Sequence, residues 1–321
     1  MPLTIAEGAP LVDRIRQTIA SRILGHDDAI TDLLAAFIAR GHVLIEGVPG
    51  TAKTLLARTM AQVLSVRFGR IQFTPDLMPA DVTGISMYRE NTREFEFQPG
   101  PVFTDILLAD EINRAPAKTQ SALLEAMAER QVTVDGKSRP LNSTFTVLAT
   151  QNPVEHEGTF PLPEAQLDRF LLKVVMTYPT LSAELAMLEL HESGFDPEQQ
   201  HRGDSLASPV TAAQVTELRT LADRVRIAPE VRGYIAAITR ATREDPALSL
   251  GASPRATVAL MRIARAGAVI EGRDFVTPDD VKARAVAVLR HRIMLAPEVE
   301  VEGRGPDDVI AAALSRIPTP A

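Results

Sequence analysis

One short stretch near the start of the chain, residues 42–54 with the sequence HVLIEGVPGTAKT, restricts the possible folds more than any other. Its first residues form an apolar run with β-branched members, which predicts a buried strand. Gly47, Pro49 and Gly50 then interrupt the strand, and Lys53-Thr54 precede a run with helical spacing. A phosphate-binding loop requires this order of elements: a strand, a glycine-rich loop, Lys-Thr and a helix.

The chemistry expected of this loop is polyphosphate binding. Its backbone N–H groups and the positive end of the following helix dipole would surround the phosphate oxygens. Lys53 would place a charge at the β- and γ-phosphates, and Thr54 would place its hydroxyl on Mg²⁺. A glycine-rich turn with a solvated lysine is the alternative. The residues expected to bind the nucleotide are Gly47, Val48, Pro49, Gly50, Thr51, Ala52, Lys53 and Thr54.

One position of the loop departs from the general pattern G-x-x-x-x-G-K-[ST], because Ala52 stands where the second glycine is usual. A methyl group costs little at that position if the residue has negative φ, and it compromises the site if positive φ is needed. We expect Ala52 to begin the helix at negative φ. Ala52→Gly should then be nearly neutral for nucleotide affinity.

A second run, Ile106–Glu111, is apolar and ends in two acids, Asp110 and Glu111. In a parallel sheet the carboxyl ends of the strands face the ligand crevice. Asp110 there can hold a metal ion through water, and Glu111 can orient and deprotonate an attacking water. Two acids that merely cap a loop are the alternative. Their position after a phosphate-binding loop favours the catalytic interpretation.

Apolar strands alternate with helical segments over residues 1–178, which predicts an α/β domain with a mostly parallel sheet. Two β-hairpins are expected within it, near residues 85–98 and 131–141. The second contains Asp135-Gly136, a dipeptide that suits a type I′ turn.

The composition changes after residue 178. Residues 179–321 are rich in Ala, Arg, Leu and Val with helical spacing, which predicts a separate all-α domain. Asp196–Ser208 is polar and contains Pro and Gly, so we expect it to be a connecting loop.

The composition excludes several kinds of site. The chain has no cysteine, which rules out disulfides, cysteine-ligated zinc and thiol catalysis and fits the cytoplasm. Its first residues, MPLTIAEGAP, lack the features of a signal peptide, and no apolar run approaches the roughly 20 residues of a membrane helix. The net charge of −7 and the 4% of aromatic residues argue against a nucleic-acid partner.

The motifs taken together resemble those of the MoxR-type AAA+ ATPases, from about residue 10 to residue 315. The resemblance rests on five segments: GVPGTAKT at 47–54, LADEINRAP at 108–116, ATQNP at 149–153, LPEAQLDRF at 162–170 and GASPRA at 251–256. It implies a core of five parallel strands in the order 5-1-4-3-2, an all-α lid domain, and inserts where the two hairpins are expected.

The same resemblance implies roles for single residues. Asp110 and Glu111 would be the Walker B pair beside the Walker A loop, and Asn152 would be sensor 1, able to orient water. Gly25 and His26 match, less specifically, the turn beside the adenine.

Two arginines complete the implied site. Arg169 would be the arginine finger, supplied to the nucleotide of a neighbouring subunit. Arg255 would be sensor 2, and its contact with the phosphates would couple the angle of the lid to the nucleotide state.

The function implied is Mg-dependent ATP hydrolysis by a homo-oligomeric, hexameric ring that remodels or matures a protein client, together with a von Willebrand factor A-domain protein. Two alternatives stay open. A chelatase-type ATPase subunit of the same clade would drive metal insertion into a tetrapyrrole, and genomic neighbours would identify it. A nucleotide-gated assembly module would turn over little ATP, and an ATPase assay would identify that.

Overall fold

The computed structural model describes residues 3–153, 158–196 and 210–320. A parallel five-stranded sheet lies at its centre, in the order β2-β5-β8-β1-β9. Counted along the chain as core strands one to five, this order is 5-1-4-3-2, which confirms the predicted fold class. The strands are β1 (Val43–Gly47), β2 (Phe68–Gln72), β5 (Ile106–Asp110), β8 (Thr146–Gln151) and β9 (Leu172–Met176).

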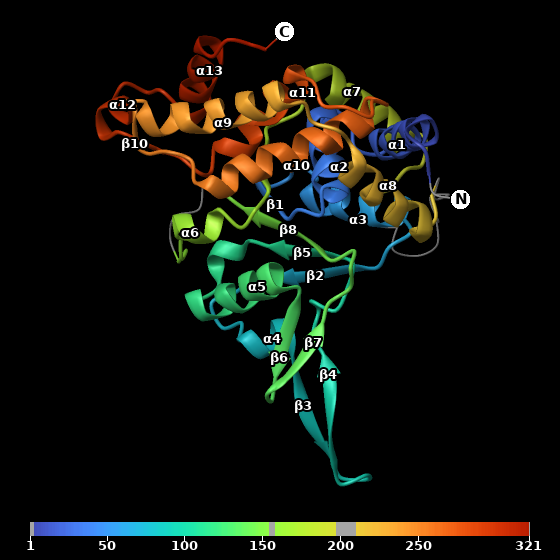
Figure 1. Cartoon of the computed structure of the whole chain (residues 1–321). Helices are drawn as coiled ribbons and strands as arrows, with labels where there is room; N and C mark the ends of the chain where they lie inside the picture. The colour runs from blue at the N-terminus through green and yellow to red at the C-terminus, as the bar shows by residue number, and fades with distance from the viewer. Residues whose placement is uncertain (1–2, 154–157, 197–209, 321) are drawn as a thin grey trace.

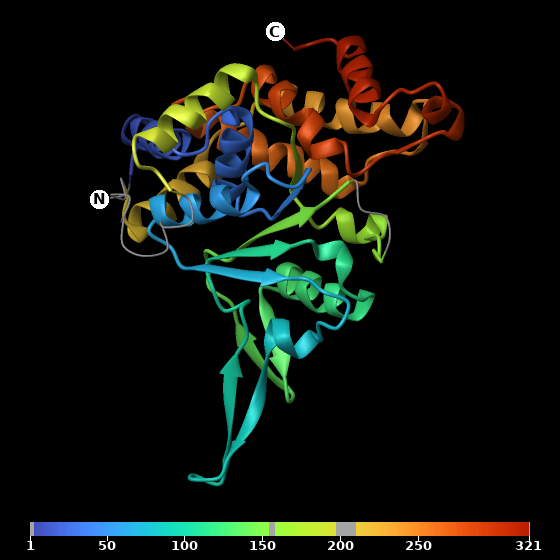
Figure 2. The same cartoon turned by 180° about the vertical axis from the view of Figure 1, so that it is seen from behind.

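Side chains of the strands alternate between two apolar layers. Val43 and Ile45 of β1 enter one cluster, whereas Leu44 enters the other. This alternation is the period-two pattern of a strand buried on both faces. Figures 1 and 2 show the first layer, with most of the lid, on one side of the sheet and α5 on the other. The helices of the first layer are α1 (Ile5–Ala20), α2 (Asp27–Ile38) and α3 (Lys53–Val63), and the second layer contains η1 (Ile112–Arg114) and α5 (Ala117–Glu129).

Two antiparallel hairpins lie where the sequence places them. Between the two strands of the second hairpin, Asp135 and Gly136 have φ of 52° and 71°, as a type I′ turn requires. The first hairpin, which follows α4 (Pro79–Thr83), projects from the body of the molecule (Figure 1). The hairpin strands are β3 (Gly84–Arg89) with β4 (Glu94–Pro99), and β6 (Gln131–Val134) with β7 (Lys137–Pro140).

The C-terminal part is helical, with one addition that the sequence pattern does not reveal. Two short strands, β10 (Leu248–Leu250) and β11 (Met294–Leu295), pair antiparallel. Strands this short show no recognisable alternation. The loop predicted over Asp196–Ser208 lies outside the described residues except for Asp196. The helices after the small α6 (Glu164–Leu167) are α7 (Leu181–Glu192), α8 (Ala212–Arg224), α9 (Pro229–Glu244), α10 (Pro254–Ile270), α11 (Pro278–Leu289), α12 (Pro297–Val301) and α13 (Pro306–Arg316).

The lid packs tightly on the first helical layer. Helix α10 contacts α1, α2 and α8, and one apolar cluster contains buried residues of all four helices and of β1. Dense packing of this kind holds the start of α10 in a fixed place relative to the sheet. The domain boundary at residue 178 stays a prediction. No helix in the described parts of the chain is long and apolar enough to cross a membrane.

Candidate active site

A cleft of about 590 Å³ lies at the carboxyl end of the sheet, beside the loop between β1 and α3. It brings together the predicted loop, both predicted acids and Asn152, which follows β8 and is 8% exposed. These residues come from three adjacent strands, so the parallel order of the sheet alone places them at one edge. The cleft is lined by Pro49, Gly50, Thr51, Ala52, Lys53, Thr54, Leu55, Asp110, Glu111, Thr150, Gln151, Asn152 and Met187.

The ammonium group of Lys53 bends back over the loop. Its Nζ donates to the carbonyl oxygens of Gly47, at 2.6 Å, and Val48, at 2.8 Å. Partial burial lowers the pKa of Lys53, while the nearby charges of Asp110 and Glu111 act in the opposite direction. A partly desolvated cation beside a helix N-terminus is suited to a polyphosphate.

Ala52 corrects one expectation. Its φ of 58° and ψ of 21° lie in the left-handed region, and the helix begins one residue later, at Lys53. The predicted negative φ is therefore wrong, because Ala52 is the cap residue at which the loop turns into the helix. This conformation costs an L-residue roughly 1–2 kcal/mol, and a glycine would adopt it without that strain.

Asp110 is held by two neighbouring strands. Thr150 of β8 donates its hydroxyl to Oδ1 at 2.7 Å, and Nη2 of Arg70 in β2 donates to Oδ2 at 2.7 Å. Asp110 is 8% exposed, and its carboxylate faces the cleft. Hydrogen bonds of this kind orient carboxylates that bind metals, and oxygen ligands such as Asp110 and Thr54 are those that Mg²⁺ prefers. The residues present therefore fit a magnesium ion.

Glu111 is restrained from two sides. Nε2 of Gln72 donates to its Oε2 at 2.7 Å, and Nε of Arg114 lies 3.2 Å from the same oxygen. Its backbone N–H donates to the hydroxyl of Thr150 at 2.8 Å, and its φ of 56° is left-handed. A strained residue with this many partners is typical of a functional site.

Sequence reasoning missed Arg70, Gln72 and Thr150. The available signal was weak: the first two alternate on a short strand, and Thr150 directly precedes Gln151-Asn152. Only the pairing of β2, β5 and β8 makes these residues neighbours of the two acids.

The predicted adenine-side turn adjoins the same loop. His26 lines a small hollow that shares Gly50, Thr51 and Ala52 with the cleft, and helix α7 contributes its other wall. Gly25 has φ of 78°, and a β-carbon there would lie 2.8 Å from that of Ala183 in α7. The lining is largely apolar and suits an adenine ring. Sequence reasoning did not assign α7 to this hollow, which it lines with Met187, Leu190 and His191.

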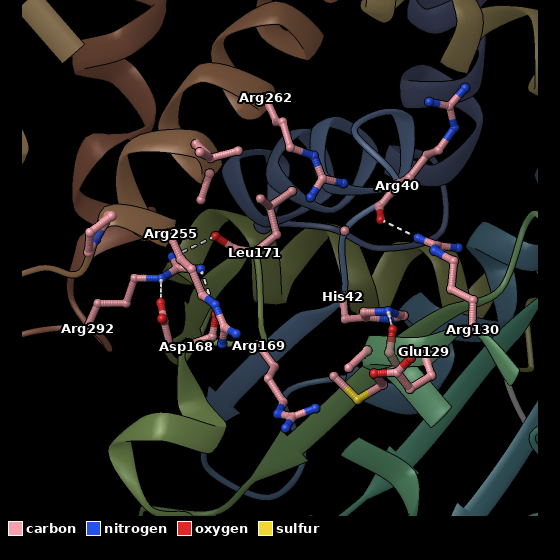
Figure 3. Close-up of a pocket in the computed structure, with 16 residues that line it drawn as sticks. Arg40, His42, Glu129, Arg130, Asp168, Arg169, Leu171, Arg255, Arg262 and Arg292 are labelled. Atoms are coloured by element: carbon pink, nitrogen blue, oxygen red, sulfur yellow. Dashed lines mark hydrogen bonds and ion pairs between the residues drawn. The ribbon is translucent and has the colours of Figure 1, made fainter. Parts of the chain in front are cut away.

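The two predicted arginines lie elsewhere. Arg169 and Arg255 line a second pocket of about 660 Å³, which also includes His42 before β1 and Leu171 before β9 (Figure 3). This pocket is therefore at the amino end of β1, whereas the phosphate-binding loop is at the carboxyl end. Five residues of β1 separate them, about 16 Å along the strand.

The packing of α10 decides where Arg255 lies. Because α10 packs on α1, α2 and α8, its first turn faces the second pocket and not the phosphate-binding loop of its own chain. Both predicted arginines thus lie in a different pocket from the loop of their own chain, and their roles at the phosphates stay predictions.

The second pocket is strongly basic. Burial lowers the pKa of Arg130 and of Arg262, and repulsion from nearby arginines, Arg40 for the first and chiefly Arg130 for the second, lowers it further. A surface with this charge excess is suited to an anion supplied by another molecule. The pocket carries two carboxylates, Glu129 and Asp168, and six arginines, Arg40, Arg130, Arg169, Arg255, Arg262 and Arg292.

Comparisons with known proteins agree with this architecture. Residues 42–172 match the "ATPase family associated with various cellular activities (AAA)", and residues 240–313 match the AAA lid domain. The uncharacterized protein YeaC of Bacillus subtilis is 45% identical over 97% of this chain and 95% of its own length. Chaperone MoxR1 of Mycobacterium tuberculosis is 42% identical over 93% of this chain and 79% of its own length.

A solved structure extends the agreement to three dimensions. The crystal structure of a candidate ATPase from Cytophaga hutchinsonii is 39% identical and superposes with a TM-score of 0.89. It covers 98% of this chain, and the chain covers 96% of it. The overall fold is thus shared with that structure, and the chain belongs to the MoxR-type AAA+ family of ATP-hydrolysing enzymes.

Proposed function

We propose that this chain hydrolyses ATP at sites shared between two copies of itself. One copy supplies the cleft with Lys53, Asp110 and Glu111, and the next supplies Arg169 and Arg255. The observation that carries the proposal is that the cleft and the arginine pocket lie at opposite ends of β1. Two different surfaces that fit each other generate a ring when the rotation closes, and the family resemblance favours six subunits.

Within a shared site, the residues of this chain have separate tasks. Glu111 orients and deprotonates the attacking water, and Asn152 helps to position it. Lys53 and the two arginines of the next copy stabilise the charge that spreads over the γ-phosphoryl oxygens. Mg²⁺, held by Thr54 and Asp110, would supply further positive charge at the phosphates.

We also propose that hydrolysis serves the remodelling or maturation of a protein client in the cytoplasm, with a von Willebrand factor A-domain protein as partner. The first hairpin supports a client-binding role, because it projects from the body (Figure 2) and carries exposed apolar side chains. Near its tip, the rings of Tyr88 and Phe95 are 5.4 Å apart, and Phe95 is 74% exposed. Exposed apolar groups of this kind mark protein-binding sites.

Mixing two inactive variants tests the shared site. Arg169→Ala should lower kcat by roughly 10³–10⁵-fold, and Lys53→Ala should lose nucleotide binding. Mixed together, the two should recover part of the activity, because some intact clefts then face an intact arginine pocket. A mixture of Lys53→Ala and Glu111→Gln is the matched control. Both of those changes damage the cleft, so no combination restores a complete site.

Dilution gives an independent measurement. Specific ATPase activity should rise with protein concentration as rings assemble. Activity that does not depend on concentration, together with no recovery in the first mixture, would contradict the shared site.

A further inference from the structure

One carboxylate contacts both segments that carry the two arginines of the second pocket. Asp168 directly precedes Arg169, and its Oδ2 accepts a hydrogen bond of 2.9 Å from the hydroxyl of Ser253. Ser253 is the N-cap of α10, two residues before Arg255. The other oxygen, Oδ1, accepts a bond of 2.7 Å from Nε of Arg292, which follows α11 (Figure 3).

Arg292 also binds the backbone of the segment that carries Arg169. Its side chain is 2% exposed, and Nη1 donates to the carbonyl oxygen of Leu171 at 2.9 Å. It also donates to the carbonyl oxygens of Phe170 and of Val288, near the end of α11. The backbone around Arg169 is thus bound to the end of one lid helix, while Asp168 binds it to the start of another.

Ser253 transmits this constraint to Arg255. Its hydroxyl donates to Asp168 and accepts a hydrogen bond of 3.2 Å from the backbone N–H of Arg255. The orientation of the first turn of α10 therefore depends on the position of Asp168. Both arginine side chains are exposed, although Nη1 of Arg169 donates to the carbonyl oxygen of Leu124 at 2.9 Å. The contacts of Asp168 act on the backbones of the two arginines and thereby on their separation.

We propose that Asp168 is a positioning residue that holds Arg169 and Arg255 at a fixed separation, so that one copy presents both to a single triphosphate. This inference rests on the proposed shared site. Each guanidinium contributes to turnover only when it lies correctly against the phosphate oxygens, and a misplacement of about 1 Å can lower the rate by roughly 10²-fold. The plain alternative is that Asp168 only anchors the lid.

Asp168→Asn tests the positioning role, because it removes the charge and keeps the shape. We expect kcat to fall by about 10- to 100-fold, whereas the variant's affinity for a fluorescent ATP analogue should stay within about twofold because its own cleft is intact. Mixing with Lys53→Ala should recover activity. Asp274→Asn removes the carboxylate of an exposed lid ion pair with Arg226 and should leave kcat unchanged.

A second variant leaves the buried ion pair intact. Asp168→Asn deprives the buried guanidinium of Arg292 of its carboxylate, which destabilises a protein strongly. Ser253→Ala breaks only the link to Arg255 and should lower kcat by about three- to tenfold. Ser253→Thr, which retains the hydroxyl, should recover most of that loss. A lowered melting temperature with unchanged kcat in Ser253→Ala would support the anchoring role alone and overturn the inference.

A combined variant separates this inference from the shared site. When Arg169→Ala and Arg255→Ala are both present, adding Asp168→Asn should lower kcat no further, because nothing remains to be positioned. If the two arginine changes each leave kcat at the wild-type value, both proposals are overturned. If they abolish activity while Asp168→Asn and Ser253→Ala retain it, only the positioning role is overturned.

Discussion

The two ends of β1 carry two surfaces that the chain builds in different ways. At the carboxyl end, the consecutive residues 49–55 form about half of the cleft lining, and residues at the ends of two neighbouring strands, together with Met187, add the rest. At the amino end, the arginine pocket joins segments far apart in the sequence, such as Asp168 and Ser253, which are 85 positions apart. Under the proposed shared site, the first surface binds the nucleotide and the second completes the site of another copy.

Substitutions in the cleft should have the largest effects on ATPase activity. Two of them should show which residue is needed for ATP binding and which for hydrolysis. Lys53→Ala should abolish ATP binding, because it removes the cation nearest the phosphates. Glu111→Gln should keep the affinity and lower kcat by roughly 10²–10⁴-fold, since the carboxylate acts on water. Nucleotide titration and steady-state ATPase measurements check both. Wild-type turnover in Glu111→Gln would remove Glu111 from its assigned role.

Arg255→Ala tests whether the two surfaces are as separate as the structure indicates. We expect kcat to fall by roughly 10²–10³-fold, as for the loss of one charge-stabilising donor, with the variant's own ATP affinity unchanged. Mixing with Lys53→Ala should recover activity. A clear loss of ATP affinity in dilute, unassembled protein would instead mean that the lid can bring Arg255 to its own cleft.

The projecting hairpin lies outside both surfaces, so its removal should not change ATP binding or basal hydrolysis. Replacing residues 85–98 by a Gly-Ser turn should leave basal ATPase activity within about twofold and remove the response to a client or partner. Tyr88→Ser with Phe95→Ser keeps the backbone and should impair the same response. Loss of folding in the shortened form, seen by circular dichroism, would show that the hairpin is structural.

Ala52→Gly should have the smallest effect and acts on the cleft alone. Because Ala52 has positive φ, glycine should relieve strain and raise the free energy of unfolding by about 1 kcal/mol. ATP affinity should change by less than about threefold if the loop already holds the binding conformation. Ala52→Val is the matched control and should destabilise, since a β-branched residue suits this conformation least. Thermal unfolding and nucleotide titration measure both quantities, and a large gain in affinity with glycine would show that alanine distorts the loop.

The sequence by itself determined the parts of this protein that depend on neighbouring residues. The apolar run before Gly47 and the run Ile106–Glu111 predict two strands, and the loop chemistry after the first predicts a phosphate site. Asp135-Gly136 predicts a tight turn. These features follow from backbone geometry within a few residues, so a single sequence contains them. The order of the sheet came from the family resemblance and not from the pattern.

Only the tertiary structure decided which of the expected residues meet. Ala52 has positive φ because it lies at the junction between the loop and the helix. The helical pattern of the residues that follow does not reveal this backbone conformation. The position of Arg255 depends on which helices α10 packs against, and helical periodicity gives the apolar face of a helix but not its partner. The link from Asp168 to Ser253 and Arg292 likewise joins distant segments. Contacts of this range depend on the packing of the whole chain, which no local pattern records.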